Sequence, residues 1–286
     1  MKTILQSKFF TAAEPEEGVI QISGLAGEKC YLIEGKDKAL LIDGLSGVGQ
    51  LKAFVRELTE LPVIMAATHG HLDHIGAAFE YKEVRIHPKD IFLLYSKAHG
   101  GDEARFNFAT LFMKYGLKLR TNPQREDTIP ACPIVTLPIF EGDRIDLGGR
   151  LIEVAELPGH TAGSVVLVDR EKKLAFGGDA CNLNTLLNLP ESETVETYHD
   201  SLLRFKKWQG SFDRMYCGHD ESPFLPSVID DGIRLCERIL AGEDDAVETE
   251  DMFGGASLLA ARRQDNYLPE CGGMCNIVYK KTRIRN

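Results

Sequence analysis

The chain has 286 residues, of which 43% are hydrophobic and 27% are charged, and this composition excludes disordered and fibrous architectures. Lysine and arginine total 33 against 43 aspartate and glutamate residues, so the formal net charge at pH 7 is −10. We do not expect such an acidic chain to bind the phosphate backbone of nucleic acids. Five of the eight histidines lie in short motifs that are typical of metal-binding loops: His69, His71, His74, His160 and His219.

Targeting signals are not evident in the sequence. Residues 1–10 lack the apolar run of a secretory signal peptide, and no segment approaches the roughly 18 apolar residues of a membrane span. The seven cysteines are odd in number and scattered, unlike a disulfide framework. We therefore predict a cytoplasmic protein with no membrane partner.

The first half of the chain alternates strand and helix signals. Strands are predicted over 19–22, 30–34 and 39–42, the last two forming an antiparallel hairpin. Apolar residues at helical spacing predict a helix within 48–59, and a buried strand is predicted over 63–67. Residues 88–130 then form an aromatic-rich helical insert, with helices over 89–98 and 103–115. Helical spacing favours packing of these aromatic side chains in the core over a lid on the site.

The second half repeats the pattern of the first. Residues 165–179 resemble residues 31–43 in having a strand, a charged turn, a second strand and an aspartate. Two similar β-rich halves predict two sheets that pack on each other. Helices are predicted over 195–208 and 225–240, and strands over 214–217 and 276–280. A C-terminal extension covers 243–286, and its acidic stretch, 243–251, is predicted to be a solvated linker.

Ligand-type residues are concentrated in the segment THGHLDH, residues 68–74, directly after a predicted strand. His69 and His71 face the same side of an extended chain and can therefore share one ion. Asp73 and His74 follow as the chain turns and are placed to hold a second ion. Four such residues in six positions predict a metal site, and imidazole and carboxylate donors suit Zn²⁺ with one coordination position open for water.

The order and spacing of several motifs point to a known family. THGHLDH (68–74), PGHTAGS (158–164), GGD (177–179) and CGH (217–219) resemble the successive motifs of the metallo-β-lactamase superfamily, and Asp43 resembles its first motif. The resemblance covers roughly residues 18–240. It implies an α+β fold, the four-layer αββα sandwich, with two mixed β-sheets and helices on the outer faces. We expect one such domain over residues 1–286, including the insert and the extension.

The resemblance also implies a dinuclear metal site. The first ion would be bound by His69, His71 and His160, and the second by Asp73, His74 and His219, with Asp179 bridging both and a hydroxide between them. Two Zn²⁺ ions are expected, with iron or manganese as alternatives.

Other residues are predicted beside these ligands. Asp43 would fix the histidine-rich loop by hydrogen bonds. Thr68 and Asn182 are also expected next to the site. Asp73 is the predicted catalytic residue, orienting the hydroxide or accepting its proton. The remaining histidines, His87, His99 and His199, are predicted to be surface or packing residues.

A metal pair lowers the pKa of bound water and so favours hydrolysis. The predicted enzyme is a metal-dependent hydrolase that cleaves an ester, lactone or thioester of a small molecule. Asp179 and the amino terminus argue against the secreted β-lactamases, which resemble this chain but have cysteine or serine at that position. Asn182 replaces the tyrosine of the lactonases, and the C-terminal part lacks the basic glutathione-binding segment of glyoxalase II-like thioesterases.

Other function classes stay open. A flavodiiron-like redox protein with a di-iron site would carry glutamate in place of His71, and a superfamily nuclease is disfavoured by the −10 charge. A metal-free scaffold would leave a complete ligand set idle. The expected partner is a small-molecule substrate, with an apolar or aromatic acyl group suggested by the insert, and a homo-oligomer remains open.

Overall fold

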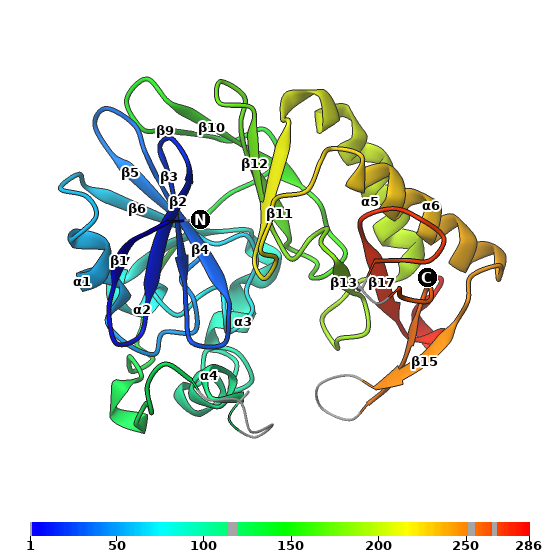
Figure 1. Ribbon diagram of the computed structural model, residues 1–286, viewed down its shortest axis with the longest axis horizontal. Helices are drawn as coiled ribbons and strands as arrows, with labels where there is room; N and C mark the ends of the chain where they lie inside the picture. Colours follow the sequence, from blue (N-terminus) through cyan, green and yellow to red (C-terminus); the bar gives the residue numbers. More distant parts are fainter. Residues whose placement is uncertain (1, 112, 114–118, 251–254, 265–267) are drawn as a thin grey trace. The chain divides into compact units, whose positions relative to one another are not determined.

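The computed structural model describes residues 2–111, 113, 119–250, 255–264 and 268–286. The chain forms two compact units (Figure 1): unit 1 comprises Met1–Ile139 and Arg144–Ile152, and unit 2 comprises Phe140–Asp143 and Glu153–Asn286. Each unit has its own hydrophobic core. The expectation of a single domain stays a prediction. No helix in the described ranges is long and apolar enough to cross a membrane.

Unit 1 is built on a mixed eight-stranded sheet whose strands follow chain order from β1 to β8. The strands are β1 (Thr3–Gln6), β2 (Thr11–Glu16), β3 (Val19–Ser23), β4 (Lys29–Glu34), β5 (Ala39–Ile42), β6 (Val63–Ala66), β7 (Glu83–Ile86) and β8 (Val135–Pro138). Pairing is antiparallel from β1 to β5 and parallel from β5 to β8. The predicted hairpin is confirmed as β4 and β5, and the predicted buried strand as β6.

Helices connect the parallel strands of unit 1: α1 (Leu51–Arg56), α2 (Ala78–Tyr81), α3 (Ile91–Tyr95) and α4 (Asp102–Ala109), with short 3₁₀ turns at Pro88–Asp90 and Arg125–Asp127. The core joins Leu32 of β4 and Leu41 of β5 with Leu51, Phe54 and Val55 of α1, so the helical stripe covers one face of the sheet. The parallel order therefore delivers the carboxyl ends of β5 and β6 to the same edge of the sheet.

Helix α1 is shorter than the predicted 48–59 segment. Gly47 and Gly49 adopt φ angles of 73° and 92°, which delay the start of the helix. A side chain at residue 49 would also meet the Phe9 ring at 2.6 Å. The helix has no side-chain cap from its preceding residue, Gln50.

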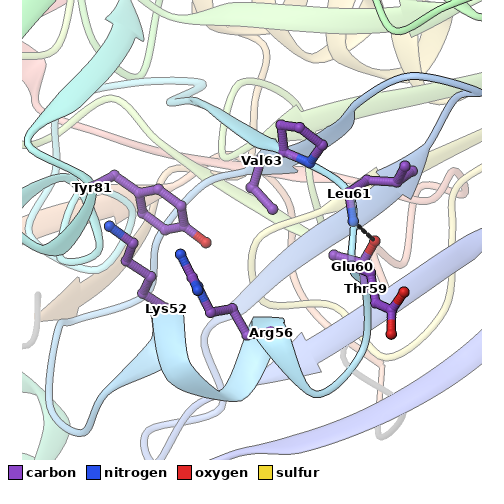
Figure 2. A pocket seen from close by; sticks show the side chains of 8 residues that line it. Lys52, Arg56, Thr59, Glu60, Leu61, Val63 and Tyr81 are labelled. Atoms are coloured by element: carbon purple, nitrogen blue, oxygen red, sulfur yellow. Dashed lines mark hydrogen bonds between the residues drawn. The ribbon is translucent and has the colours of Figure 1, made fainter.

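Instead, Glu80 caps α1 from a distance. Its carboxylate accepts hydrogen bonds from the backbone N–H groups of Leu51 and Lys52, at 2.9 and 3.2 Å. Lys52 and Arg56 lie one turn apart on this helix, facing Tyr81, the neighbour of Glu80 (Figure 2). Burial raises the pKa of Glu80 to about 7, although the two N–H groups and Lys52 oppose that rise.

The raised pKa makes the stability of the protein depend on pH. Because Glu80 binds its proton more tightly in the folded state, its contribution to the free energy of unfolding is fully present below pH 4.5 and is lost as pH rises through about 7. We expect the free energy of unfolding of the wild type, relative to Glu80→Gln, to fall by up to about 3 kcal/mol across that window. Urea titrations of both proteins at a series of pH values check this, and a constant difference would contradict it.

The insert at 88–130 contains shorter helices than predicted. Helix α3, preceded by the 3₁₀ turn, replaces 89–98, and α4 ends at Ala109; residues 112 and 114–115 of the predicted second helix lie outside the described residues. The prediction that the aromatic residues pack in the core is wrong for Phe92 and Tyr95, which are 60% and 58% exposed. The buried positions of α3 are held by Leu93 and Leu94, so the apolar face of the helix is set by its leucines.

Unit 2 repeats the hairpin of unit 1, as the internal repeat predicts. Strands β11 (Val165–Asp169) and β12 (Leu174–Gly178) are antiparallel, and β14 (Arg214–Cys217) is parallel to β12. The chain returns to unit 2 within β10 (Leu151–Glu156), after β9 (Arg144–Asp146), and the five-stranded sheet has the order β14-β12-β11-β10-β9. This mixed sheet agrees with the predicted fold class.

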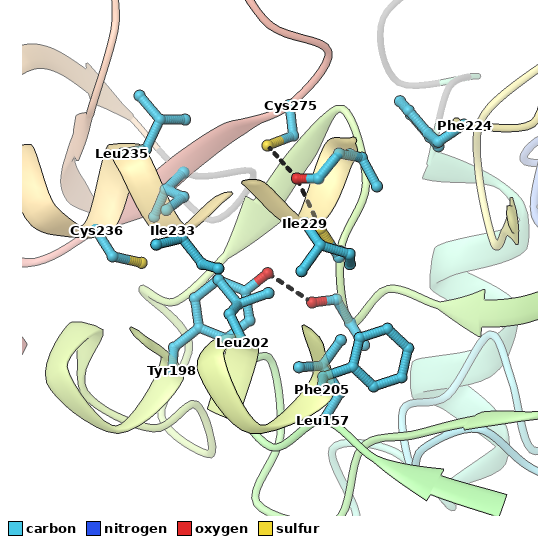
Figure 3. Close-up of a cluster of buried hydrophobic side chains, with 14 of the residues drawn as sticks. Leu157, Tyr198, Leu202, Phe205, Phe224, Ile229, Ile233, Leu235, Cys236 and Cys275 are labelled. Atoms are coloured by element: carbon cyan, nitrogen blue, oxygen red, sulfur yellow. Dashed lines mark hydrogen bonds between the residues drawn. The ribbon is translucent and has the colours of Figure 1, made fainter. Parts of the chain in front are cut away.

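Helices α5 (Val195–Phe205), with the 3₁₀ segment Lys206–Ser211, and α6 (Val228–Ala241) pack together in unit 2. Figure 3 shows Tyr198, Leu202 and Phe205 of α5 next to Ile229 and Ile233 of α6 in the core of this unit. The Tyr198 hydroxyl donates to the backbone carbonyl of Ala180 at 2.8 Å. The core thereby fixes the chain directly after β12.

A third, four-stranded sheet in unit 2 was not predicted. Its order is β13-β17-β16-β15, with β13 (Asn184–Leu186), β15 (Val247–Glu250), β16 (Ala256–Leu259) and β17 (Asn276–Tyr279). The prediction that 243–251 is a solvated linker is therefore wrong for residues 247–250. Val247 and Thr249 are half-buried while Glu248 and Glu250 are exposed. The alternating burial is that of a strand, but the acidic residues on the exposed face of this edge strand made the segment resemble a solvated linker.

Candidate metal centre

The THGHLDH segment forms a compact loop after β6, at the carboxyl end of that strand. All four predicted ligands in it are buried: His69, His71, Asp73 and His74 are 1%, 5%, 7% and 0% exposed. The backbone N–H of His74 donates to the carbonyl of His71 at 3.0 Å, and the N–H of Gly44 donates to the carbonyl of His74 at 2.7 Å. The loop is thus folded back on itself and tied to the end of β5.

The loop brings its four predicted ligands together. The ring centroid of His69 lies 4.7 Å from that of His71 and 4.0 Å from that of His74. An Asp73 carboxylate oxygen lies 3.7 Å from Nε2 of His74. Three imidazoles and a carboxylate in one buried cluster form the donor set that divalent transition metals prefer.

Asp43 connects this cluster to the sheet. One carboxylate oxygen accepts from the backbone N–H of Thr68 at 2.7 Å, and the other lies 2.9 Å from both the Thr68 hydroxyl and Nδ1 of His74. Asp43 is 2% exposed and adopts a left-handed φ of 65° at the end of β5, a conformation that aspartate and asparagine tolerate better than most residues. The carboxylate therefore holds the first and last residues of the loop.

The Nδ1 atoms of three of the predicted histidine ligands have hydrogen-bond partners, which suits metal binding through Nε2. Nδ1 of His69 lies 3.1 Å from the Thr68 hydroxyl, and Nδ1 of His74 contacts Asp43. In unit 2, Nδ1 of His160 contacts the backbone carbonyl of Leu186 at 2.9 Å. Partners on Nδ1 fix the orientation of each ring and leave Nε2 as the ligand atom. The residues present therefore fit a divalent metal.

Unit 2 gathers the other three predicted ligands at the ends of its strands. His160 follows β10, Asp179 follows β12 and His219 follows β14. One Asp179 oxygen lies 3.2 Å from Nε2 of His219 and 3.8 Å from Nε2 of His160. His160 and Asp179 are buried, whereas the His219 side chain is 35% exposed. A carboxylate near two imidazole Nε2 atoms is the arrangement expected of a shared ligand.

Asn182 and Cys217 lie close to these ligands in the chain. The Asn182 side-chain oxygen accepts from the backbone N–H of Asn184 at 3.1 Å. The backbone N–H of Asn182 donates to the Thr185 hydroxyl at 3.2 Å, and the two hydrogen bonds shape the turn before β13. Burial raises the pKa of the Cys217 thiol, with a further rise from Asp220. The Cys217 thiol donates to the backbone carbonyl of Cys181 at 3.3 Å.

Sequence reasoning missed two residues of the unit 1 cluster. The His99 ring, assigned to surface or packing, stacks on His71 with centroids 4.7 Å apart and 16° between the planes. Asp90 is 1% exposed and its carboxylate accepts from the N–H of Gly70 at 2.9 Å. Both residues come from the insert, and no local sequence pattern marks them. The turn at His99 requires glycine at the next position, because a Cβ atom on Gly100 would lie 1.8 Å from the Leu94 carbonyl oxygen.

The other two histidines have local roles. His87 is 6% exposed, and its ring accepts from the N–H of Lys89 at 3.3 Å, capping the 3₁₀ turn. The His199 side chain, on α5, lies 3.8 Å from both Asp200 and Glu237. Both agree with their predicted structural roles.

Comparison with known proteins identifies the family. The family model described as the metallo-beta-lactamase superfamily matches residues 24–214. The chain belongs to the metallo-beta-lactamase superfamily. Solved metallo-beta-lactamases from Erythrobacter litoralis and Pontibacter korlensis share the fold, with TM-scores of 0.56 and 0.52 at 17% and 15% identity. They cover 82% of this chain in both cases, and 99% and 97% of the respective structures. The predicted metallo-β-lactamase fold is confirmed.

Curated relatives in this superfamily include hydrolases. The human protein named acyl-coenzyme A thioesterase MBLAC2 is 26% identical over 260 residues, covering 85% of this chain and 79% of that protein. The Haemophilus influenzae protein named hydroxyacylglutathione hydrolase GloC is 31% identical over 163 residues, covering 53% of this chain and 66% of that protein. Family membership and these relatives make the chain a metal-dependent hydrolase.

Proposed function

We propose that this member of the metallo-beta-lactamase superfamily is a dinuclear zinc hydrolase that cleaves an acyl ester, lactone or thioester of a small molecule. The observation that carries the proposal is the buried cluster of His69, His71, Asp73 and His74. Asp43 holds this cluster by hydrogen bonds to the backbone N–H of Thr68 and to Nδ1 of His74. A cluster built only for packing would not need an aspartate that fixes both ends of the loop.

In this proposal the family pattern assigns the ligands. His69, His71 and His160 would hold one ion, Asp73, His74 and His219 would hold the other, and Asp179 would be available to both. When bound, the ion pair supplies an activated water as nucleophile at neutral pH. Support comes from the family membership and from the donor chemistry within each unit.

The protein's own residues orient the reaction. An Asp73 carboxylate oxygen lies 3.7 Å from the Nε2 atom of His74, and the carboxylate would serve as proton acceptor beside the proposed ligands. Asp43 holds the tautomer of His74, since its oxygen contacts Nδ1 at 2.9 Å. Thr68 fixes His69 in the same way through its hydroxyl. These contacts pre-organise the ligands, which reduces the cost of ordering them when metal binds.

Thioesters are the favoured substrates within the acyl class. A human relative that covers 85% of this chain is named an acyl-coenzyme A thioesterase. We propose a cytoplasmic setting because all seven cysteines are free, as is usual in a reducing compartment. The expected partner remains a small molecule.

A substrate panel tests the proposal. Acyl esters, lactones and thioesters are assayed with the wild type, with His71→Ala and with His199→Ala, whose altered side chain lies on α5. We expect two zinc ions per purified wild-type chain, thioester hydrolysis by the wild type and His199→Ala, and a loss of roughly 10²-fold or more in kcat/KM for His71→Ala, because the metal no longer has its full ligand set.

Metal analysis and activity separate the alternatives. Equal hydrolysis by wild type and His71→Ala would contradict the proposal. Iron together with redox activity would support the flavodiiron-like alternative, and absence of bound metal would support a scaffold. Circular dichroism spectra of the three proteins show whether each variant is folded.

A further inference from the structure

Unit 1 contains a cavity of about 570 Å³ at the amino end of β6, where α1 and the end of α2 approach that strand (Figure 2). It is lined by Lys52, Arg56, Thr59, Glu60, Leu61, Pro62, Val63 and Tyr81. The volume falls within the range of small-molecule sites. The THGHLDH loop follows the opposite, carboxyl end of the same strand, so the cavity is separate from the unit 1 metal ligands.

Two cationic side chains project from α1 toward this cavity. Lys52 and Arg56 are one helical turn apart, and the Lys52 ammonium lies 5.1 Å from the centre of the Tyr81 ring and 3.4 Å from the backbone carbonyl of Glu80. The Glu80 carboxylate interacts electrostatically with Lys52, but within the described part of the chain neither Lys52 nor Arg56 forms a salt bridge with a carboxylate. The exposed Glu60 carboxylate lies away from both in Figure 2. The cavity wall formed by α1 is therefore positively charged.

Tyr81 adds a hydrogen-bond donor. Its hydroxyl oxygen is buried and has no hydrogen-bond partner among the described residues, and Figure 2 shows it directed toward the same space as the Arg56 guanidinium. Burial and the nearby Glu80 raise the pKa of Tyr81, so its hydroxyl stays protonated and can donate. A buried hydroxyl without a partner carries a free-energy cost that an acceptor in the cavity would remove.

Beyond Thr59 and Glu60, the remaining wall is apolar. Leu61, Pro62 and Val63 lead into β6, and the Leu61 N–H is occupied by the Thr59 hydroxyl at 3.2 Å. The Thr59 hydroxyl in turn donates to Glu34. These groups are therefore not directed at a polar ligand, and this side of the cavity suits an apolar or aromatic moiety.

We propose that this cavity binds a small organic phosphate, with its phosphate between Lys52, Arg56 and the Tyr81 hydroxyl and its apolar part against Leu61 and Val63. Two cations suit a phosphate dianion better than a single carboxylate, and a guanidinium can donate two parallel hydrogen bonds to phosphate oxygens. The proposal does not depend on the hydrolase activity.

The test uses phenyl phosphate as probe and backbone amide NMR of the metal-loaded protein. We expect saturable shifts of the Leu61 and Val63 amides, weaker shifts with inorganic phosphate and none with phenol. The double variant Lys52→Ala/Arg56→Ala should weaken binding roughly tenfold or more, and Tyr81→Phe by a smaller factor. The matched control is Lys36→Ala/Lys38→Ala, which removes two exposed cations from the same unit and should bind as the wild type does.

Three outcomes would overturn the proposal. The first is the absence of saturable shifts at Leu61 and Val63. The second is equal weakening in the control pair, which would indicate only nonspecific attraction to positive charge. The third is a response confined to the Gly70 amide, which would place the phosphate at the metal-binding loop. Thermal unfolding of each variant confirms that the comparison is made between folded proteins.

Discussion

Asp43→Asn is expected to weaken metal binding by roughly 10- to 100-fold, and hydrolysis with it, although Asp43 is not a predicted metal ligand. Asparagine tolerates the left-handed φ of 65° and keeps nearly the same shape. It loses the negative charge opposite Nδ1 of His74 and can accept through only one atom, whereas the carboxylate now serves Thr68 and His74 with two oxygens. The tautomer and orientation of His74 are then less firmly held.

Zinc affinity, measured by competition with a chromophoric chelator, checks this expectation. The matched control is Asp169→Asn, which replaces another fully buried aspartate at a strand end, where an oxygen accepts from the N–H of Lys172 at 3.0 Å. Zinc affinity should stay at the wild-type value in this control. If Asp43→Asn also keeps it, Asp43 does not act through the loop ligands.

Arg105→Met is expected to lower the free energy of unfolding by about 3 to 5 kcal/mol. The Arg105 side chain is fully buried and donates to the carbonyls of Gly100, Ser46 and Ile129, at 3.2, 3.4 and 2.5 Å. Its guanidinium also pairs with Asp102 at 2.8 Å and lies 4.6 Å from the centre of the Phe79 ring. Methionine fills similar volume but leaves these acceptors without a donor.

Urea unfolding of Arg105→Met and Arg125→Met measures this effect. Arg125 belongs to the same insert, pairs with Glu103 at 3.2 Å and lies over the Phe106 ring at 5.4 Å, but its side chain is 61% exposed. Its loss should cost less than about 1 kcal/mol. Similar losses in both variants would show that burial of Arg105 contributes little to stability.

The elements that could be predicted are those whose sequence signals lie close together along the chain. The hairpin of β4 and β5, its repeat in β11 and β12, and the strand Arg214–Cys217 follow from alternation and turns within about fifteen residues. The cluster from His69 to His74 was predictable for the same reason. His160, Asp179 and His219 are far apart in sequence, and only the resemblance of their motifs placed them in one ligand set.

The features that were missed depend on distant partners. Strand β13 pairs in parallel with β17, joining residues 184–186 to residues 276–278, and no local pattern encodes this pairing. His99 reaches His71 because Ser96 holds the turn before it, with the Ser96 hydroxyl accepting from the His99 N–H at 3.1 Å. Exposed Phe92 and Tyr95 show that aromatic spacing alone could not choose the buried face of α3.

The pairing of β13 with β17 links His160, a proposed metal ligand, to residues 276–278. Nδ1 of His160 contacts the carbonyl of Leu186, and Leu186 is the register partner of Val278. The adjacent Leu187 N–H donates to the Val278 carbonyl at 2.7 Å. Because proteins are synthesised from the amino terminus, the support for this ring is completed only when residues near 278 leave the ribosome. A nascent chain would carry the histidine-rich loop of unit 1 well before it could orient His160, so the proposed ligand set would be complete only late in synthesis.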